Sequence, residues 1–304
     1  MGTYNDENPN ALNADGWRTV LFDGFNGSAV DRDTWPVMYG GDSGNGGAFQ
    51  WSNDDVRVGD GELTISMTDH GGWWSAGGLS QGWEGQTYGR FEVRAKVDPG
   101  QGTQGVLVLW PTDNVYPPEI DLLETPEGDR SKAHFTVHWD GGGGADHYEG
   151  QSFSLDTSQW HTYAVDWTPE RLTYYIDGRE MYSTTSNVPQ EPMALGFSGW
   201  VSSDGQTWFN GGPDATTPAQ VNLHVDWARI SVADGGRQGG AGVQQAAVVQ
   251  AEPVEAALEA ALVAAPEEPP PAPAPVEQAA QPVDWEALAA QAMANYEATG
   301  QWFI

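Results

Sequence analysis

The chain has 304 residues, 43 acidic against 12 basic side chains and no cysteine, which gives a formal net charge of −31. Disulfides and thiolate metal sites are therefore excluded, and nucleic acids and anionic membranes are disfavoured as partners because binding them requires clustered Lys and Arg. The 39 Gly and 20 Pro suit many short strands joined by tight turns.

The composition divides the chain into three parts. Residues 1–234 carry frequent aromatic residues and turn signals about every ten residues, which predicts one β domain. Residues 235–282 are rich in Gly, Ala and Pro and predict a disordered linker. Residues 283–304 predict a short amphipathic helix, with Asp284 placed to cap it.

Alternating apolar and polar residues predict strands in the first part, and no strand–helix–strand pattern interrupts them. This pattern favours an all-β fold, a sandwich of two antiparallel sheets. The segment 221–232 is long enough for a pair of strands, and Asp177-Gly178 is typical of a hairpin turn. Strands are expected over residues 62–67, 91–97, 135–139, 163–167 and 172–176.

Three acids lie close together at 119–124, Glu-Ile-Asp-Leu-Leu-Glu. Side chains of a strand alternate between its faces, so Glu119 and Asp121 share one face. A regular strand would turn Glu124 to the opposite face. One extra residue at the adjacent apolar pair Leu122-Leu123 would form a β-bulge and bring Glu124 onto the face of the other two acids.

Three neighbouring carboxylates repel one another and raise one another's pKa, so a fold has little structural reason to build them. Glycoside hydrolysis with retention has a chemical reason, because it needs one ionised carboxylate as nucleophile and one protonated carboxyl as acid. The alternative is a row of surface acids on a solvated strand. The spacing therefore favours a hydrolase of glycosidic bonds.

The acidic run resembles the signature of glycoside hydrolase family sixteen, in the bulged Glu-x-Asp-x-x-Glu form of laminarinases, agarases and their relatives. The resemblance covers most of residues 17–234 and implies a jelly-roll β-sandwich with sugars bound along a concave cleft. Four further stretches resemble family motifs in the family's order: residues 21–27, 88–96, 160–178 and 225–230.

The resemblance implies that Glu119 is the nucleophile, that Glu124 is the general acid/base, and that Asp121 tunes Glu119 and bonds to the sugar. Aromatic side chains are expected in the cleft because they stack on the apolar faces of sugar rings. The side chains expected to bind substrate are Asn45, Arg90, Trp110, His138, Trp139 and Trp200.

No cofactor is expected for catalysis. Asp226 matches a position that binds a structural calcium in many relatives, and Gly61 is placed to offer a backbone carbonyl to it. A surface aspartate at the end of a strand is the alternative for Asp226. The expected partner is a polysaccharide, bound by a monomer.

The leading hypothesis is a retaining endo-β-glycanase for β-1,3- or mixed β-1,3-1,4-glucan. The run after Gly100-Gln101-Gly102 lacks two aromatic residues common in β-1,3-glucanases, so a bacterial exopolysaccharide or a galactan is the alternative substrate. A non-catalytic sugar-binding protein is the alternative of another class, although all three acids are present. A plant-type transglycosylase is disfavoured by the bulged spacing.

An enzyme of this kind is expected to be extracellular. Residues 1–10 are polar and lack the basic and apolar parts of a signal peptide. The helix predicted over residues 283–304 resembles the C-terminal signal that bacterial type I export machineries read. A linker that ends in a docking helix is the alternative.

Overall fold

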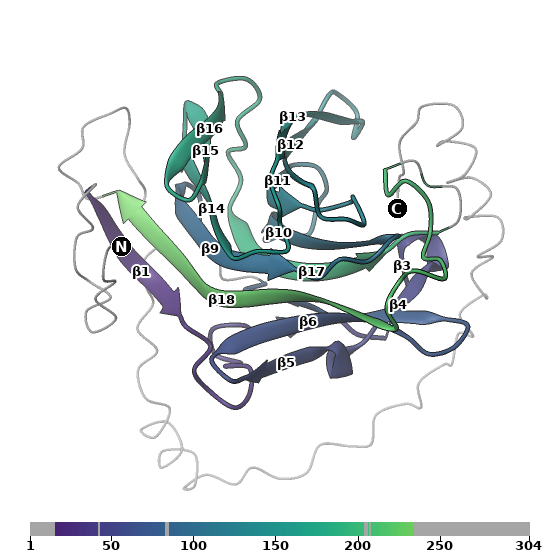
Figure 1. The fold of residues 1–304 in the computed structure, drawn as a ribbon. Coiled ribbons are helices and arrows are strands. Elements are labelled where there is room, and N and C mark those ends of the chain that lie inside the picture. Colours follow the sequence, from purple (N-terminus) through teal and green to yellow (C-terminus); the bar gives the residue numbers. More distant parts are fainter. Residues whose placement is uncertain (1–15, 42, 83–84, 204–205, 207, 234–304) are drawn as a thin grey trace, which may run out of the picture. The chain divides into compact units, whose positions relative to one another are not determined.

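The computed structural model describes residues 16–41, 43–82, 85–203, 206 and 208–233, which form two β-sheets packed face to face (Figure 1). The fold is therefore the all-β sandwich that the alternating sequence predicts. None of the helices among these residues has the length and apolar character needed to cross a membrane. The predicted linker and C-terminal helix lie outside the described residues.

The larger sheet has eleven strands, in the order β16-β15-β14-β9-β18-β6-β7-β4-β3, with β1 paired to β18 and β5 paired to β6. Its strands are β1 (Trp17–Asp23), β3 (Ser43–Gly44), β4 (Phe49–Trp51), β5 (Val56–Gly59), β6 (Glu62–Asp69), β7 (Trp74–Ala76), β9 (Gly89–Val97), β14 (His161–Thr168), β15 (Arg171–Ile176), β16 (Arg179–Thr184) and β18 (Gln220–Ala233). Short 3-10 turns at Asn45–Gly47 and Asn53–Asp55 flank β4.

The smaller sheet has seven strands, in the order β13-β12-β11-β10-β17-β8-β2. They are β2 (Val37–Met38), β8 (Gly78–Ser80), β10 (Thr103–Pro111), β11 (Glu119–Glu124), β12 (Lys132–Asp140), β13 (Asp146–Ser154) and β17 (Met193–Val201). This sheet bends, because β11, β12 and β13 rise from the level of β10 and β17 (Figure 1).

The core lies between the sheets. Every second residue of the long strands is apolar and points into it. Leu63 of β6, Val93 of β9 and Leu107 of β10 are among its fully buried members. The alternate residues of β9 are charged and lie on the other face of the larger sheet. Burial of one face therefore fixes the register of each strand, since a shift by one residue would move every charge inward.

The predicted strands are all present, with ends that extend by one to three residues. The hairpin turn at Asp177-Gly178 is also present, and both residues have positive φ, as a type I′ turn requires. The segment predicted as a possible pair of strands is instead the single strand β18. A bulge between Val225 and Trp227 lets this long strand follow the twist of its neighbours.

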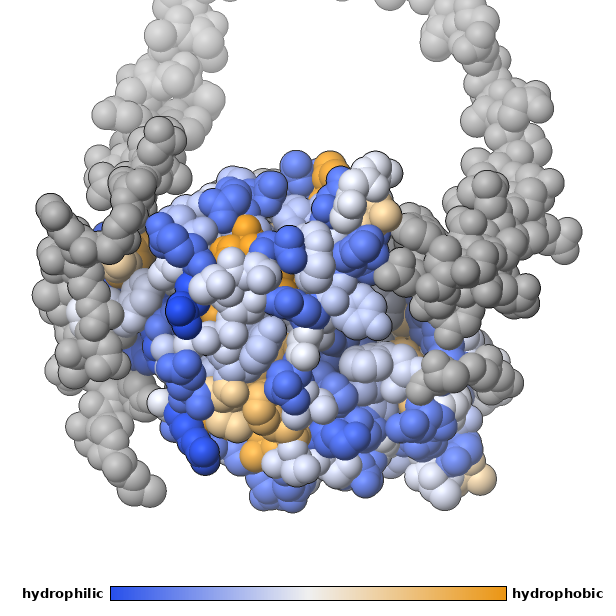
Figure 2. All heavy atoms as spheres, turned by 90° about the horizontal axis from the view of Figure 1, so that it is seen from above, coloured by the Kyte–Doolittle hydropathy of each residue, from blue (hydrophilic) through white to orange (hydrophobic). Residues whose placement is uncertain are grey.

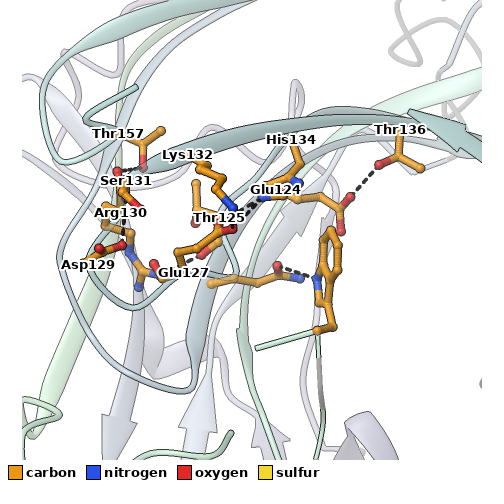
Figure 3. Close-up of polar contacts among 12 residues, drawn as sticks. Glu124, Thr125, Glu127, Asp129, Arg130, Ser131, Lys132, His134, Thr136 and Thr157 are labelled. Atoms are coloured by element: carbon orange, nitrogen blue, oxygen red, sulfur yellow. Dashed lines mark hydrogen bonds and ion pairs between the residues drawn. The ribbon is translucent and has the colours of Figure 1, made fainter. Parts of the chain in front are cut away.

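Arg130 holds the loop that connects β11 to β12, and its side chain is fully buried. Its guanidinium group donates to the backbone oxygens of four residues and to one hydroxyl. Two of these residues, Thr125 and Glu127, are drawn with it in Figure 3. The buried charge is thus satisfied by carbonyl dipoles from β10 and from the loop itself. The acceptors are the carbonyls of Asp98, Thr103, Thr125 and Glu127 and the Thr103 hydroxyl.

Arg130→Met should lower the free energy of unfolding by about 3 kcal/mol or more, because it leaves several buried carbonyls without a donor. Guanidinium chloride unfolding measures the change. Arg179→Met is the matched control, since Arg179 is exposed on β16. Equal stability of the two variants would contradict the clamping role of Arg130.

Candidate active site

The three acids of β11 lie on one face of the smaller sheet because the strand contains an extra residue. Against β10, Val108 pairs with Asp121 and Leu107 pairs with Leu123, so Leu122 is skipped. Against β12, the step from Asp121 to Glu124 spans one residue more than the partner strand. The predicted bulge at Leu122-Leu123 is confirmed, and both leucines are fully buried.

We call the side of the smaller sheet that points away from the core the open face. Seen from the side of β12 and β13, the surface is mostly hydrophilic and holds small apolar patches (Figure 2). A surface of this kind suits a ligand rich in hydroxyl groups. Apart from the acids of β11, the open face includes Gln104, Val106, Val108 and Trp110 of β10, His134, Thr136 and His138 of β12, Asp146 and Tyr148 of β13, and Ser198 and Trp200 of β17.

Each acid of β11 faces a polar side chain of β12. Glu119 pairs with His138, Asp121 with Thr136, and Glu124 with His134. The Thr136 hydroxyl donates to Glu124 Oε2 at 2.8 Å (Figure 3). The open face therefore carries two matched rows of side chains, one acidic and one of histidine and threonine.

The Glu119 end of the row is held by a polar network. His138 Nδ1 lies 3.0 Å from Asp146 Oδ1 and 3.0 Å from the Tyr116 hydroxyl. His138 Nε2 lies 3.6 Å from Asp121 Oδ2. Asp121 is only 2% exposed and shares a side-chain hydrogen bond with Glu119. Two carboxyl groups can share such a bond only when one of them is protonated.

The Glu124 end has a different neighbour. His134 Nε2 lies 2.9 Å from Glu127 Oε2, and Lys132 Nζ lies 3.2 Å from Glu127 Oε1 (Figure 3). The ring of His134 also contacts the edge of Trp208 at 5.0 Å between centroids. Glu127 and Lys132 thus lie behind His134, in and after the loop that Arg130 holds.

Burial controls the ionisation of the three acids. It is the largest cause that raises the pKa of Glu119 to about 7, with the charge of Glu124 adding to the rise and His138 opposing it. Burial also raises the pKa of Asp121 well above its usual range and raises that of Glu124, which the bond from Thr136 partly offsets. Asp121 therefore keeps its proton most firmly and donates it to Glu119.

Trp110, Trp200 and Asn45 lie on or beside the open face, where substrate binding was predicted. Trp110 follows Leu109, which pairs with Ile120, and its ring stacks on Tyr116 at 5.4 Å. Trp200 packs edge-on against Phe49 and Trp51 at 5.7 Å. The Asn45 amide donates to the carbonyl of Val201 at the end of β17 and exchanges hydrogen bonds with Gln206. Contact with sugar stays a prediction for all three.

Two predicted substrate-binding residues do not lie on the open face. Arg90 belongs to the larger sheet, on the face away from the core, and pairs with Glu92 at 3.2 Å and Asp166 at 2.9 Å. Trp139 follows His138 along β12 and so points to the other side, where it contacts His147. The placement of both in the cleft was wrong, because alternation along β9 and β12 turns them away from the acids.

The calcium prediction concerns the larger sheet. Val225 of β18 pairs with Leu63 of β6, which brings Asp226 towards the turn before β6 that contains Gly61. Asp226 forms an ion pair with Arg94, so a cation there would compete with a guanidinium group. Within the part of the chain that the structure describes, one cluster of side chains has the spacing of a metal site. It consists of Glu119, Asp121 and His138, whose potential ligand atoms all lie within 4.8 Å of one another. The hydrogen bond between Glu119 and Asp121, with His138 Nε2 3.6 Å from Asp121 Oδ2, suits acid–base chemistry at that place.

Sequence reasoning missed Thr136, Asp146 and Tyr148. Thr136 carried a usable signal, because it alternates with His134 and His138 and so shares their face. Asp146 and Tyr148 carried none, because they follow a glycine-rich turn whose length does not reveal the register of the next strand. Tyr148, 62% exposed beside His138, offers an aromatic ring to a ligand on the open face.

The sequence profile described as glycosyl hydrolases family 16 matches residues 44–229 of the chain. The chain belongs to this family. It is accordingly a glycoside hydrolase, and the retaining mechanism is general to the family.

Curated relatives of this family 16 chain include the β-glucanase of Bacillus subtilis (strain 168), which is 26% identical over 214 residues, 69% of this chain and 86% of that protein. The endo-1,3-1,4-β-glycanase ExsH of Rhizobium meliloti is 38% identical over 92 residues, 30% of this chain and 20% of that protein. The laminarinase catalytic domain of Thermotoga petrophila shares the fold, with a TM-score of 0.62 and 22% identity over 72% of this chain and 98% of that one.

Glu119→Gln should stabilise the fold at neutral pH. The folded-state pKa of Glu119, about 7, lies above the ordinary value of 4.5. Below about pH 4.5 the Glu119 carboxyl is protonated in both the folded and the unfolded protein. Its favourable contribution to the free energy of unfolding is then fully present, and it is lost as the pH rises through 7. The variant should exceed the wild type by on the order of 2 kcal/mol at pH 8, and the gap should close towards pH 4.

Chemical denaturation at several pH values measures this gap. Glu180→Gln provides the control, because Glu180 is exposed on β16. A difference between Glu119→Gln and the wild type that does not change with pH would show that burial of the carboxyl is not what shifts its ionisation.

Proposed function

We propose that this family 16 glycoside hydrolase is a retaining endo-β-glycanase that cleaves internal bonds of β-1,3- or mixed β-1,3-1,4-glucan. The observation that carries the proposal is the bulge at Leu122-Leu123, which places Glu119, Asp121 and Glu124 on one open face. Along the same face Trp110 lies at the Glu119 end of the acidic row and Trp200 beyond the Glu124 end, so aromatic rings flank the acids on both sides, as binding the middle of a polymer requires.

In the first step Glu119 attacks the anomeric carbon and Glu124 gives its proton to the leaving oxygen. Glu119 must be ionised for this attack. The hydrogen bond from protonated Asp121 and the nearby His138 both favour its ionised form. The product of this step is a glycosyl ester on Glu119 and a shortened glucan with a free hydroxyl.

In the second step Glu124, now ionised, takes a proton from water, and the oxygen of that water attacks the anomeric carbon. The Thr136 hydroxyl bonds to Glu124 Oε2 and stabilises this carboxylate. The ester breaks and returns Glu119 to its ionised form. Two displacements restore the original stereochemistry.

The relatives support the choice of glucan, since one is named a β-glucanase and another an endo-1,3-1,4-β-glycanase. The net charge of −31 also favours a neutral polymer. A bacterial exopolysaccharide or a galactan is the second candidate substrate. The aromatic residues common in β-1,3-glucanases are incomplete on β10, where Trp110 is the aromatic residue beside Glu119.

We also propose that the enzyme acts outside the cell, because a polymeric glucan does not cross a membrane. We propose further that it acts as a monomer, because all three acids come from one strand of one chain. The export signal predicted over residues 283–304 lies outside the described residues and stays a prediction.

Glu119→Ala and Glu124→Ala should each lower glucan hydrolysis by about 1,000-fold or more. Azide should then separate their roles on an aryl β-glycoside with an acidic phenol. Azide replaces the lost carboxylate in Glu119→Ala and gives an α-glycosyl azide, whereas in Glu124→Ala it attacks the glycosyl ester and gives a β-glycosyl azide. NMR of the products reads the configuration.

The matched control is Glu170→Ala, an exposed acid in the turn between β14 and β15, which should keep full activity. Release of reducing ends from β-1,3-glucan, mixed-linkage glucan and galactan identifies the substrate, and an early fall in viscosity identifies endo-cleavage. Binding of these glucans without hydrolysis by the wild type would favour the sugar-binding alternative. Exchanged azide configurations would reverse the two assignments.

For the calcium site we predict that millimolar calcium raises the melting temperature relative to EDTA and that Asp226→Asn loses the gain. The donors would be the Asp226 carboxylate and the Gly61 carbonyl. Asp60→Asn, at an exposed turn position beside Gly61, is the control and should keep the gain. Equal melting temperatures in calcium and EDTA would leave the Arg94 ion pair as the role of Asp226.

A further inference from the structure

Asp146 lies far from the three acids along the chain, yet it is buried on the open face at the start of β13. Its Oδ1 and Oδ2 lie 3.0 Å and 3.3 Å from His138 Nδ1. The Tyr116 hydroxyl lies 3.0 Å from the same nitrogen. Two side chains from outside the catalytic strand therefore hold one nitrogen of one imidazole.

This contact fixes Nδ1 of His138 as a hydrogen-bond donor. Burial alone would raise the pKa of Asp146, but the bond to His138 lowers it below its usual value, so Asp146 is ionised. An ionised carboxylate only accepts hydrogen bonds, and His138 Nδ1 must therefore donate. The other nitrogen, Nε2, is the one that lies 3.6 Å from Asp121 Oδ2.

We propose that Asp146 is a positioning residue for hydrolysis, because by holding His138 Nδ1 it aims the Nε2–H of the charged imidazole at Asp121 Oδ2 and so keeps the Asp121 proton on the other oxygen, directed to Glu119. The inference rests on the proposed function. A rotated imidazole would present a carbon to Asp121 and leave one of its oxygens without this neighbour. A charged imidazole in the held position also favours the ionised form of Glu119.

The second histidine of β12 shows that the arrangement is specific to His138. His134 is held through Nε2, the nitrogen at the tip of its ring, by Glu127 (Figure 3). Its partner carboxylate is shared with Lys132 and belongs to the loop after β11. Of the two histidines, His138 is the one whose ring tip, Nε2, faces a carboxyl group of β11.

Several titratable groups surround His138, and the nearby carboxylates affect the pKa of its imidazole. Burial lowers its pKa, and the nearby carboxylates raise it above the ordinary value, Asp146 first and Glu119 next. Tyr148 contacts its ring at 5.6 Å from β13. The titratable groups around it are Glu119, Asp121 and Glu124 of β11, Asp146 and Tyr148 of β13, and Tyr116.

The test is Asp146→Asn, which keeps the size of the side chain and removes its charge. It should lower kcat by about tenfold or more at pH 6 with little change in KM, because the imidazole loses its fixed orientation. Without the Asp146 carboxylate His138 gives up its proton more readily, and Glu119 loses the imidazolium charge that favours its ionisation, an effect larger than the relief of repulsion from Asp146 itself. The acidic limb of the kcat/KM profile should therefore move to higher pH by about 0.5 unit or more. Part of the loss should therefore be recovered at pH 8.

Asp177→Asn is the matched control. Asp177 Oδ2 lies 2.7 Å from His161 Nδ1, so the change removes the same kind of pair, but in the larger sheet. Asp177 has positive φ, which asparagine also tolerates. This variant should keep the wild-type profile. If Asp146→Asn does not fold, Tyr116→Phe removes the second contact to Nδ1 and should shift the limb in the same direction by less.

Proton NMR titration of His138, assigned by the signal missing in His138→Gln, needs no substrate. Its pKa should fall in Asp146→Asn and stay unchanged in Asp177→Asn. The NMR titration therefore tests the Asp146–His138 contact even if the proposed function is wrong. A wrong proposed function would show itself separately, as inactivity of the wild type on every glucan. A wild-type profile and His138 titration in Asp146→Asn, or an equal loss of activity at every pH without a shifted limb, would overturn the proposal.

Discussion

The extra residue in β11 is the constraint on which the rest of the site depends. A strand has a side-chain period of two, so acids five positions apart point to opposite faces unless the period is broken. The bulge breaks it at two adjacent leucines, both of which are fully buried. The apolar pair therefore anchors the irregularity in the core while the acids on either side of it remain on the open face. Without this local break, Glu124 would be buried between the sheets.

Gathering three acids on one half-buried face works against stability, since each carboxyl is harder to ionise there than in water. The structure offsets this with hydrogen-bond donors from β11 and β12 and with the positive charge of His138 on β12. Thr136 bonds to Glu124, Asp121 donates to Glu119, and His138 supports both. The same groups that reduce the cost of burial also keep the acids in the ionisation states that hydrolysis requires.

The two sheets divide the charged residues between different tasks. On the larger sheet, Arg90, Glu92 and Arg229 form ion pairs on the face away from the core. On the smaller sheet, the charged groups remain directed at one another across the open face, with Arg130 fixing the loop beside them. Both faces read as alternating charged and apolar strands in the sequence, so alternation alone does not separate a structural ion pair from a catalytic carboxyl.

The sequence by itself determined the sandwich, the three acids and the bulge, because each follows from side-chain alternation within one strand. It also singled out Trp110, Trp200 and His138 for the cleft, and the structure carries all three on strands of the sheet that holds the acids. Only the tertiary structure decided that Arg90 lies on the far sheet, that Trp139 points away, and that Asp146 meets His138. Those facts depend on which strands become neighbours and in what register. The buried core sets that register through contacts between residues far apart in the chain.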